Sequence, residues 1–190
     1  MKKNLANKLT LTRLALLPFI IILLFLPEHW AWAAWTCLVL YIIGALTDFL
    51  DGWVARKFDQ VTEFGKLFDP IADKIFVVAI LVMLIESGRV EWIGTLAILV
   101  ILVREFTISG LREFLGGHDI KLPVTSLAKW KTATQMLATG LLIISPVTPL
   151  YIDLFGLGCL IAAASLTALT GWHYLQGALE HFKKSHDDIL

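Results

Sequence analysis

The sequence has little cysteine, no excess of either charge and no separate polar domain. Its two cysteines, Cys37 and Cys159, lie in apolar runs without the spacing of metal ligands, so they are interpreted as small packing residues. Sixteen Lys and Arg residues balance sixteen Asp and Glu residues. Because the net charge is zero, no overall field directs the chain to nucleic acid or to acidic substrates.

A cleavage site is also missing near the start of the chain. Lys2, Lys3 and Lys8 precede the first apolar run, residues 13–26, as they would in a signal peptide, but no small-residue cleavage site follows it. We therefore expect this run to remain in the protein as a membrane helix. No low-complexity segment and no convincing internal repeat is visible either.

Apolar residues are what the chain has in abundance. They make up 57% of its 190 residues, and seven of them are tryptophan. A helix that crosses a membrane needs about 20 mostly apolar residues, and six segments reach or approach that length: about 12–27, 33–55, 70–87, 91–107, 131–150 and 154–177. Single spans must be helical, because hydrocarbon offers no partner for backbone N–H groups. The sequence predicts an all-α integral membrane bundle of six transmembrane helices, and the run lengths disfavour a soluble bundle.

The basic residues predict the orientation of this bundle. With six spans, both termini and the loops after spans 2 and 4 share one side, which holds every Lys and Arg except Arg89. By the positive-inside rule that side is cytoplasmic. Four tryptophans cluster toward the opposite face, as in an aromatic belt: Trp30, Trp32, Trp35 and Trp92. We expect one membrane-embedded domain, 1–190, with a short interfacial segment, 1–12, and a polar tail, 181–190.

Two pairs of aspartates border the apolar segments on the predicted cytoplasmic side. Asp48 and Asp51 are three residues apart at the end of span 2, and Asp69 and Asp73 are four apart at the start of span 3. At helical spacing each pair shares one face. Residues 52–68 lie between the pairs and are enough to turn the chain, so the two pairs are expected to converge.

The start of span 3 has its own local signal. Pro70 suits the first turn of a helix, with Asp69 as its N-cap. Asp59 and Glu63 lie in the polar stretch before it and are interpreted as solvated residues.

Four converging carboxylates predict a metal site. They cannot all stay ionised together without compensation, and a divalent cation removes the conflict. Hard oxygen ligands at this density suit Mg²⁺ or Mn²⁺, and four carboxylates suit two ions. Two such ions clamp a diphosphate, which is phosphoryl-transfer chemistry at a membrane surface. Acidic residues at helix ends are often only solvated caps, but paired spacing at interfacial depth disfavours that interpretation here.

The stretch from Asp48 to Asp73 reads D-x2-D-G-x2-A-R-x8-G-x3-D-x3-D. At every fixed position it resembles the signature of the CDP-alcohol phosphatidyltransferases. The resemblance implies six transmembrane helices, a homodimer and a two-metal site made by the four aspartates. It also implies that a hydroxyl nucleophile displaces CMP from a CDP-linked lipid, with Asp73 as general base. Four residues are implied to line the cytidine diphosphate pocket: Gly52, Ala55, Arg56 and Gly65.

Residues outside the motif predict the acceptor. Four cations lie between spans 4 and 5 or at their ends: Arg104, Arg112, Lys129 and Lys131. Together they would bind an additional phosphate, which glycerol 3-phosphate has and serine, choline or ethanolamine lack. These segments are similar to those of the bacterial phosphatidylglycerophosphate synthases, the branch of the family that uses CDP-diacylglycerol and glycerol 3-phosphate. Thr10 and Arg13 are similar to that branch's interfacial segment at the substrate entrance, and the implied location is multi-pass in the bacterial inner membrane.

Three alternatives stay open. A sister transferase that uses inositol phosphate or phosphatidylglycerol would share every motif residue and differ only in the acceptor pocket. An intramembrane prenyltransferase would place its aspartate motifs farther apart. A membrane cation transporter or channel would show paired half-repeats and interrupted helices near the membrane centre, whereas these carboxylates crowd one interface.

Overall fold

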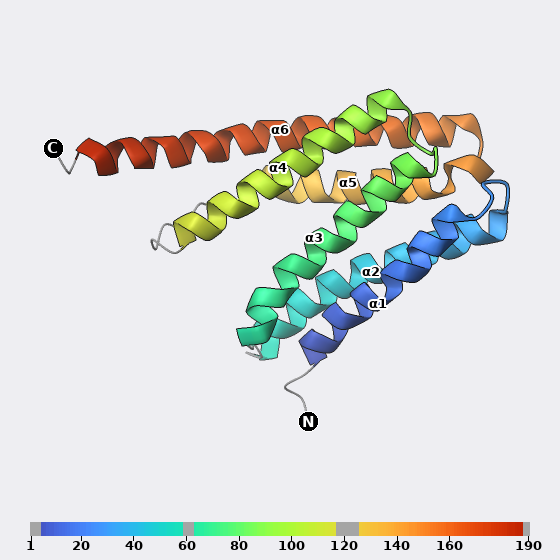
Figure 1. Ribbon diagram of the computed structural model, residues 1–190, viewed down its shortest axis with the longest axis horizontal. Coiled ribbons are helices and arrows are strands. Elements are labelled where there is room, and N and C mark those ends of the chain that lie inside the picture. Colours follow the sequence, from blue (N-terminus) through green and yellow to red (C-terminus); the bar gives the residue numbers. More distant parts are fainter. Residues whose placement is uncertain (1–4, 59–62, 117–125, 188–190) are drawn as a thin grey trace. The chain divides into compact units, whose positions relative to one another are not determined.

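The fold is helical throughout the part of the chain that the structure describes. The computed structural model describes residues 5–58, 63–116 and 126–187, and their side chains over 10–47, 68–115 and 130–179. Within these ranges no strand occurs, which confirms the all-α class. Six α-helices and one short 3₁₀ turn follow one another (Figure 1): α1 Leu5–Phe25, α2 Ala31–Phe58, α3 Glu63–Glu86, α4 Trp92–Gly116, α5 Ser126–Ile144, η1 Ser145–Val147 and α6 Leu150–Asp187.

The helices differ in the length of their apolar stretches, and so in how well each could cross a membrane. Trp92–Leu115 within α4 and Leu150–Leu179 within α6 are long and apolar enough to cross a bilayer. Thr10–Phe25 and Ala31–Thr47 form shorter apolar stretches of α1 and α2. Large apolar side chains such as Phe19, Trp92 and Leu154 are more than half exposed, as expected of surfaces that face lipid rather than water.

The acidic region between the second and third helices is more helical than its polarity predicts. α2 continues through Phe58 and α3 already begins at Glu63, so residues 52–58 and 63–68 are helical. Pro70 lies inside α3 and Asp69 is not its N-cap, so the predicted start of this helix was wrong. Glu63, Lys66 and Leu67 are good helix formers, and Glu63 favours a helix N-terminus. Asp59 lies outside the described residues.

The chain divides into two compact units, which are treated separately: Met1–Glu91 with Thr139–Gly156, and Trp92–Ala138 with Leu157–Leu190. In the first unit α1 packs against α2 and α3. Leu17, Ile20 and Leu24 recur every three or four residues along α1 and are buried. Cys37 is buried beside the Ile20 carbonyl oxygen, in agreement with its predicted packing role. The predicted single domain is not tested by this division.

A close contact joins α2 and α3 in the first unit. The Tyr41 and Phe76 rings stack with centroids 6.1 Å apart. A Cβ added at Gly44 would collide with the Phe76 ring, so the absence of a side chain lets the ring approach the α2 backbone. This packing fixes α3 against α2 below the ends that carry the aspartates.

The turn after α3 is tied to the end of α5. Gly88 adopts a φ of 70°, which glycine tolerates without strain. The next residue, Arg89, is buried and donates a hydrogen bond from Nη1 to the Ile143 carbonyl oxygen. Burial lowers the pKa of the Arg89 guanidinium, and the nearby charge of Glu28 opposes that shift. The only basic residue predicted on the far side of the membrane is therefore a packing element.

The second unit contains α4 and parts of α5 and α6. α4 buries Ile98, Ile101, Ile108 and Leu115 on one face, at spacings of three and seven residues. The part of α6 in this unit buries Leu160, Ala163, Thr167 and Thr170 in the same way. Gly171 on α6 leaves room for the long side chain of Arg104 on α4, whose contacts are described below.

Candidate functional site

The two aspartates of α3 meet two polar residues of α1. Thr10 Oγ1 donates a hydrogen bond to Asp69 Oδ1 over 2.7 Å, and Arg13 Nη1 lies 3.4 Å from Asp73 Oδ1. Thr10 and Arg13 are each only 1% exposed, whereas half of the Asp73 side chain is accessible. Buried donors therefore hold carboxylates that remain reachable from outside.

These contacts follow from the helical register of both segments. Asp69 and Asp73 are one turn apart on α3, and Thr10 and Arg13 are about one turn apart on α1. Both contacts advance in the same direction along the sequence, so the two helices run parallel here with their polar ends together. The predicted entrance residues thus lie directly at the predicted metal ligands.

The other motif residues are placed by their backbone alone. Asp48 and Asp51 lie on the continuous helix α2, three residues apart, so the predicted helical spacing holds. Gly52, Ala55 and Arg56 follow on the same helix, and Gly65 lies in the first turn of α3. The side chains of these residues are outside the described set, so the convergence of the four aspartates and the cytidine diphosphate pocket stay predictions.

The described donors on α3 fit a hard divalent cation. Asp69 and Asp73 supply carboxylate oxygens on one helix face, the ligand type that Mg²⁺ and Mn²⁺ prefer. Among the side chains that the structure describes, no cluster of three or more His, Cys, Asp or Glu could hold a metal ion. Asp48 and Asp51 of α2, whose side chains lie outside the described set, are the other ligands that the sequence predicts.

A second cluster of charges lies in the other unit, where α4 meets α5. Glu105 Oε2 accepts from Arg104 Nη1 over 3.1 Å and from Lys131 Nζ over 2.5 Å. All three side chains are mostly buried, with 11%, 31% and 7% of Arg104, Glu105 and Lys131 exposed. One carboxylate oxygen thus joins two of the predicted acceptor-binding cations.

α6 supplies the remaining partners of these cations. Arg104 Nη2 donates to Thr170 Oγ1 over 3.4 Å, and Arg112 Nη2 donates to the Tyr174 hydroxyl over 2.8 Å. The Tyr174 ring faces both guanidinium groups, with its centroid 5.0 Å from Arg112 Cζ and 6.0 Å from Arg104 Cζ. A tyrosine ring attracts cations through its quadrupole. Arg104, Arg112 and Lys131 are therefore brought together, while the Lys129 side chain lies outside the described set.

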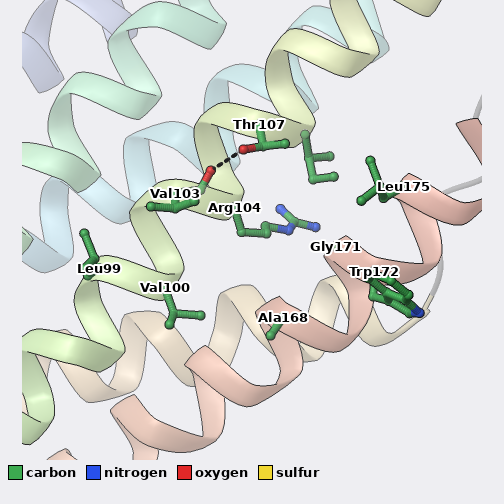
Figure 2. A pocket seen from close by; sticks show the side chains of 10 residues that line it. Leu99, Val100, Val103, Arg104, Thr107, Ala168, Gly171, Trp172 and Leu175 are labelled. Atoms are coloured by element: carbon green, nitrogen blue, oxygen red, sulfur yellow. Dashed lines mark hydrogen bonds between the residues drawn. The ribbon is translucent and has the colours of Figure 1, made fainter. Parts of the chain in front are cut away.

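A groove runs beside Arg104 between α4 and α6 (Figure 2). Its volume is about 400 Å³, and its walls are mainly apolar. Among the described residues of the lining, Arg104 is the only charged one, and its neighbours include Leu99, Val103, Ala168 and Trp172. Water is scarce beside such walls, and a charge there interacts more strongly with a bound anion than it would in bulk solvent.

Three residues of this second cluster escaped the sequence analysis: Glu105, Thr170 and Tyr174. Glu105 could have been found, because an ionisable residue next to Arg104 near the end of an apolar span signals a functional or paired group. Thr170 and Tyr174 carry no such signal, since their roles arise only when α6 packs on α4.

Curated relatives match nearly the whole chain. A protein of Rickettsia typhi is 41% identical over 182 residues, which cover 95% of this chain and 99% of the relative. One of Cereibacter sphaeroides is 37% identical over 220 residues, covering 96% and 99%. One of Haemophilus influenzae is 38% identical over 180 residues, covering 94% and 95%. All three are named CDP-diacylglycerol–glycerol-3-phosphate 3-phosphatidyltransferase.

The family itself is shown by a match to most of the chain. The model of the family described as CDP-alcohol phosphatidyltransferase matches residues 3–172. This range includes the motif from Asp48 to Asp73, the α1 residues that contact it and the cation cluster of α4 and α5. The protein belongs to the CDP-alcohol phosphatidyltransferase family.

Proposed function

We propose that this protein transfers the phosphatidyl group of CDP-diacylglycerol to glycerol 3-phosphate, which gives phosphatidylglycerophosphate and CMP. The observation that carries the proposal is the match of almost the entire chain to relatives named for this reaction. As a member of the family it is an enzyme of phospholipid synthesis. CDP-diacylglycerol would supply the phosphatidyl group from the bilayer.

The reaction exchanges one phosphorus–oxygen bond for another. The acceptor hydroxyl attacks the phosphorus that bears the diacylglycerol, and the bond to the CMP oxygen breaks. Asp73 takes the proton from the attacking hydroxyl; its carboxylate is half accessible, so an acceptor can reach it, and buried Arg13 orients it. Thr10 holds Asp69 through its hydroxyl in the same region. Two Mg²⁺ or Mn²⁺ ions, bound by Asp48, Asp51, Asp69 and Asp73, would neutralise the diphosphate.

The cation cluster supports an acceptor that carries a phosphate. Arg104, Arg112 and Lys131 carry three positive charges and Glu105 one negative charge, so these four groups sum to +2. A phosphate monoester carries close to two negative charges at neutral pH, and an Arg fork binds such an oxyanion well. A neutral or zwitterionic headgroup would leave these charges unmatched. Lys129 is proposed to join them. Glycerol 3-phosphate fits this requirement, and inositol phosphate is the second candidate.

The remaining parts of the proposal concern the membrane and the assembly. Six helices are proposed to cross the bacterial inner membrane, with both termini and the active site on the cytoplasmic side, on the basis of the charge asymmetry. Gly52, Ala55, Arg56 and Gly65 are proposed to form the cytidine diphosphate pocket, and Thr10 with Arg13 its entrance. The family resemblance supports a homodimer within the lipid membrane.

The decisive experiment measures CMP release by the purified protein in detergent or lipid. CDP-diacylglycerol is offered with glycerol 3-phosphate, inositol phosphate, phosphatidylglycerol, glycerol or serine, each with Mg²⁺, with Mn²⁺ or with EDTA. We expect CMP release that requires glycerol 3-phosphate and a divalent ion. Release with inositol phosphate instead would establish the activity of the sister transferase. An absence of release with every acceptor would contradict a transferase and favour the alternative of a membrane cation transporter.

A further inference from the structure

Gly171 of α6 lies directly against the side chain of Arg104. A Cβ built at Gly171 would approach Arg104 Cγ to 2.8 Å, Nε to 3.6 Å and Cδ to 3.8 Å. These three atoms belong to one side chain, and the first distance is shorter than real Cβ contacts allow. The space that a side chain at position 171 would take is therefore occupied by the stem of Arg104.

The path of Arg104 across α6 determines where its guanidinium lies. Figure 2 shows the side chain extending from α4 toward Gly171 in the groove between the two helices. The stem packs against the α6 backbone, while the charged end reaches Glu105 on one nitrogen and Thr170 on the other. The guanidinium is thus held on both sides, while the stem of the side chain passes over the glycine.

We propose that Gly171 is a positioning residue, whose bare backbone holds Arg104 beside Lys131 as a preformed anion site for the phosphate of the acceptor. The inference rests on the proposed function and assigns Gly171 a role that acts only through Arg104. Glycine is among the poorest helix formers. Its presence within the long helix α6 is explained here by the close approach of another side chain.

Alanine at position 171 would change the direction of Arg104. The nearest atom is Cγ, close to the base of the side chain, so Arg104 cannot avoid the new methyl group by moving only its tip. A different rotamer at the base swings the guanidinium away from Thr170 and Glu105. The anion site then loses a charge-assisted donor, although the helix itself gains a better helix former.

The test compares Gly171→Ala with a matched control on the same helix. Gly158→Ala adds the same methyl group where no atom lies within 4 Å. CMP release is measured while glycerol 3-phosphate and CDP-diacylglycerol are varied separately. We expect Gly171→Ala to raise the KM for glycerol 3-phosphate roughly ten- to hundredfold, the loss of a hydrogen bond to a charged group. The KM for CDP-diacylglycerol should change less than twofold, and Gly158→Ala should match the wild type in both.

A double-mutant cycle shows whether Gly171 acts through Arg104. Arg104→Ala alone should raise the same KM, and Gly171→Ala should add almost nothing in the Arg104→Ala background. An equal effect of Gly171→Ala in both backgrounds would overturn the proposal, as would a rise in the KM for CDP-diacylglycerol of the same size. If Gly171→Ala does not fold, the double variant must fold again, because truncating Arg104 removes the clash. Failure of that rescue also contradicts the proposal.

A binding measurement separates this inference from the proposed function. Inorganic phosphate and glycerol 3-phosphate are titrated without CDP-diacylglycerol, and the rise in melting temperature is recorded. The wild type and Gly158→Ala should be stabilised at concentrations at least tenfold lower than Gly171→Ala. Equal stabilisation of all three proteins would contradict the proposed positioning role of Gly171. A wild type that binds phosphate but releases no CMP with glycerol 3-phosphate would contradict the proposed function alone.

Discussion

Thr10 and Asp69, 59 residues apart in sequence, are joined by a 2.7 Å hydrogen bond between α1 and α3. One turn farther along both helices, Arg13 reaches Asp73 in the same way. The first helix therefore contributes to the site, because its polar end holds two carboxylates of the motif. Changing an outer group that orients a metal ligand typically lowers metal affinity or activity by about 10- to 100-fold.

Thr10→Val removes the hydroxyl while it keeps the shape of the side chain. We expect the Mg²⁺ concentration that gives half-maximal CMP release to rise about 10- to 100-fold, because Asp69 loses the donor that orients it. The matched control is Thr36→Val, since the Thr36 hydroxyl bonds only to the Trp32 carbonyl of its own helix. An unchanged metal requirement in Thr10→Val would show that the hydrogen bond does not orient a metal ligand.

Asp73→Asn tests the proposed general base. The amide keeps the size of the carboxylate but accepts no proton from the acceptor hydroxyl, so CMP release should fall by about 10² to 10⁴ or more. Thermal unfolding should change far less than the rate, because the amide oxygen of Asn can still accept the hydrogen bond of buried Arg13. Asp153→Asn, at the start of α6, serves as the control. A purified Asp73→Asn variant with a near-normal rate would remove Asp73 from the mechanism.

Glu105→Gln tests the carboxylate that joins Arg104 and Lys131. Without its charge two largely buried cations lose their counter-ion, so the free energy of unfolding should fall by about 1–3 kcal/mol. Inorganic phosphate should recover more of this loss in the variant than it adds to the wild type, because it supplies the missing negative charge. Glu113→Gln on the exposed side of α4 should leave stability unchanged. Equal melting temperatures of Glu105→Gln and wild type would refute the argument.

Arg89→Met separates stability from catalysis. The Ile143 carbonyl at the end of α5 loses its charged donor, so we expect the free energy of unfolding to fall by about 1–3 kcal/mol. The KM values for both substrates should remain unchanged at temperatures where the variant is folded. Arg89→Lys keeps a hydrogen-bond donor, so its free energy of unfolding should lie between those of the wild type and Arg89→Met. A change in either KM would show that this turn influences the active site.

Local patterns in the sequence were sufficient to predict the helices and to predict that Asp69 and Asp73 share one helix face. Apolar runs interrupted by "PEHW" and "SPVTPLYID" predict breaks where α1 and α5 end. Asp69 and Asp73 lie on one helix and one face, as their spacing predicts. Thr10 and Arg13 were chosen through a family resemblance, and the structure places both beside these aspartates. The spacing alone could not have paired α1 with α3.

The misses came from interactions that no local pattern contains. Pro70 suggested that the helix begins there, but α3 already begins at Glu63, a residue that favours a helix N-terminus. Tyr174 and Thr170 lie 62 and 66 residues from the arginines that they contact. Such contacts depend on how two helices pack, and a single sequence without that packing does not specify them.

The proline within α3 has a mechanical consequence for the acids on either side of it. Pro70 has no backbone N–H, so the hydrogen bond that would return to the carbonyl of Lys66 cannot form. The ladder is therefore interrupted in the turn from Lys66 to Pro70, which contains Asp69, and such a break is where a helix bends with the least resistance. A bend at this turn would change the direction of the segment that holds Asp69 relative to the segment that holds Asp73.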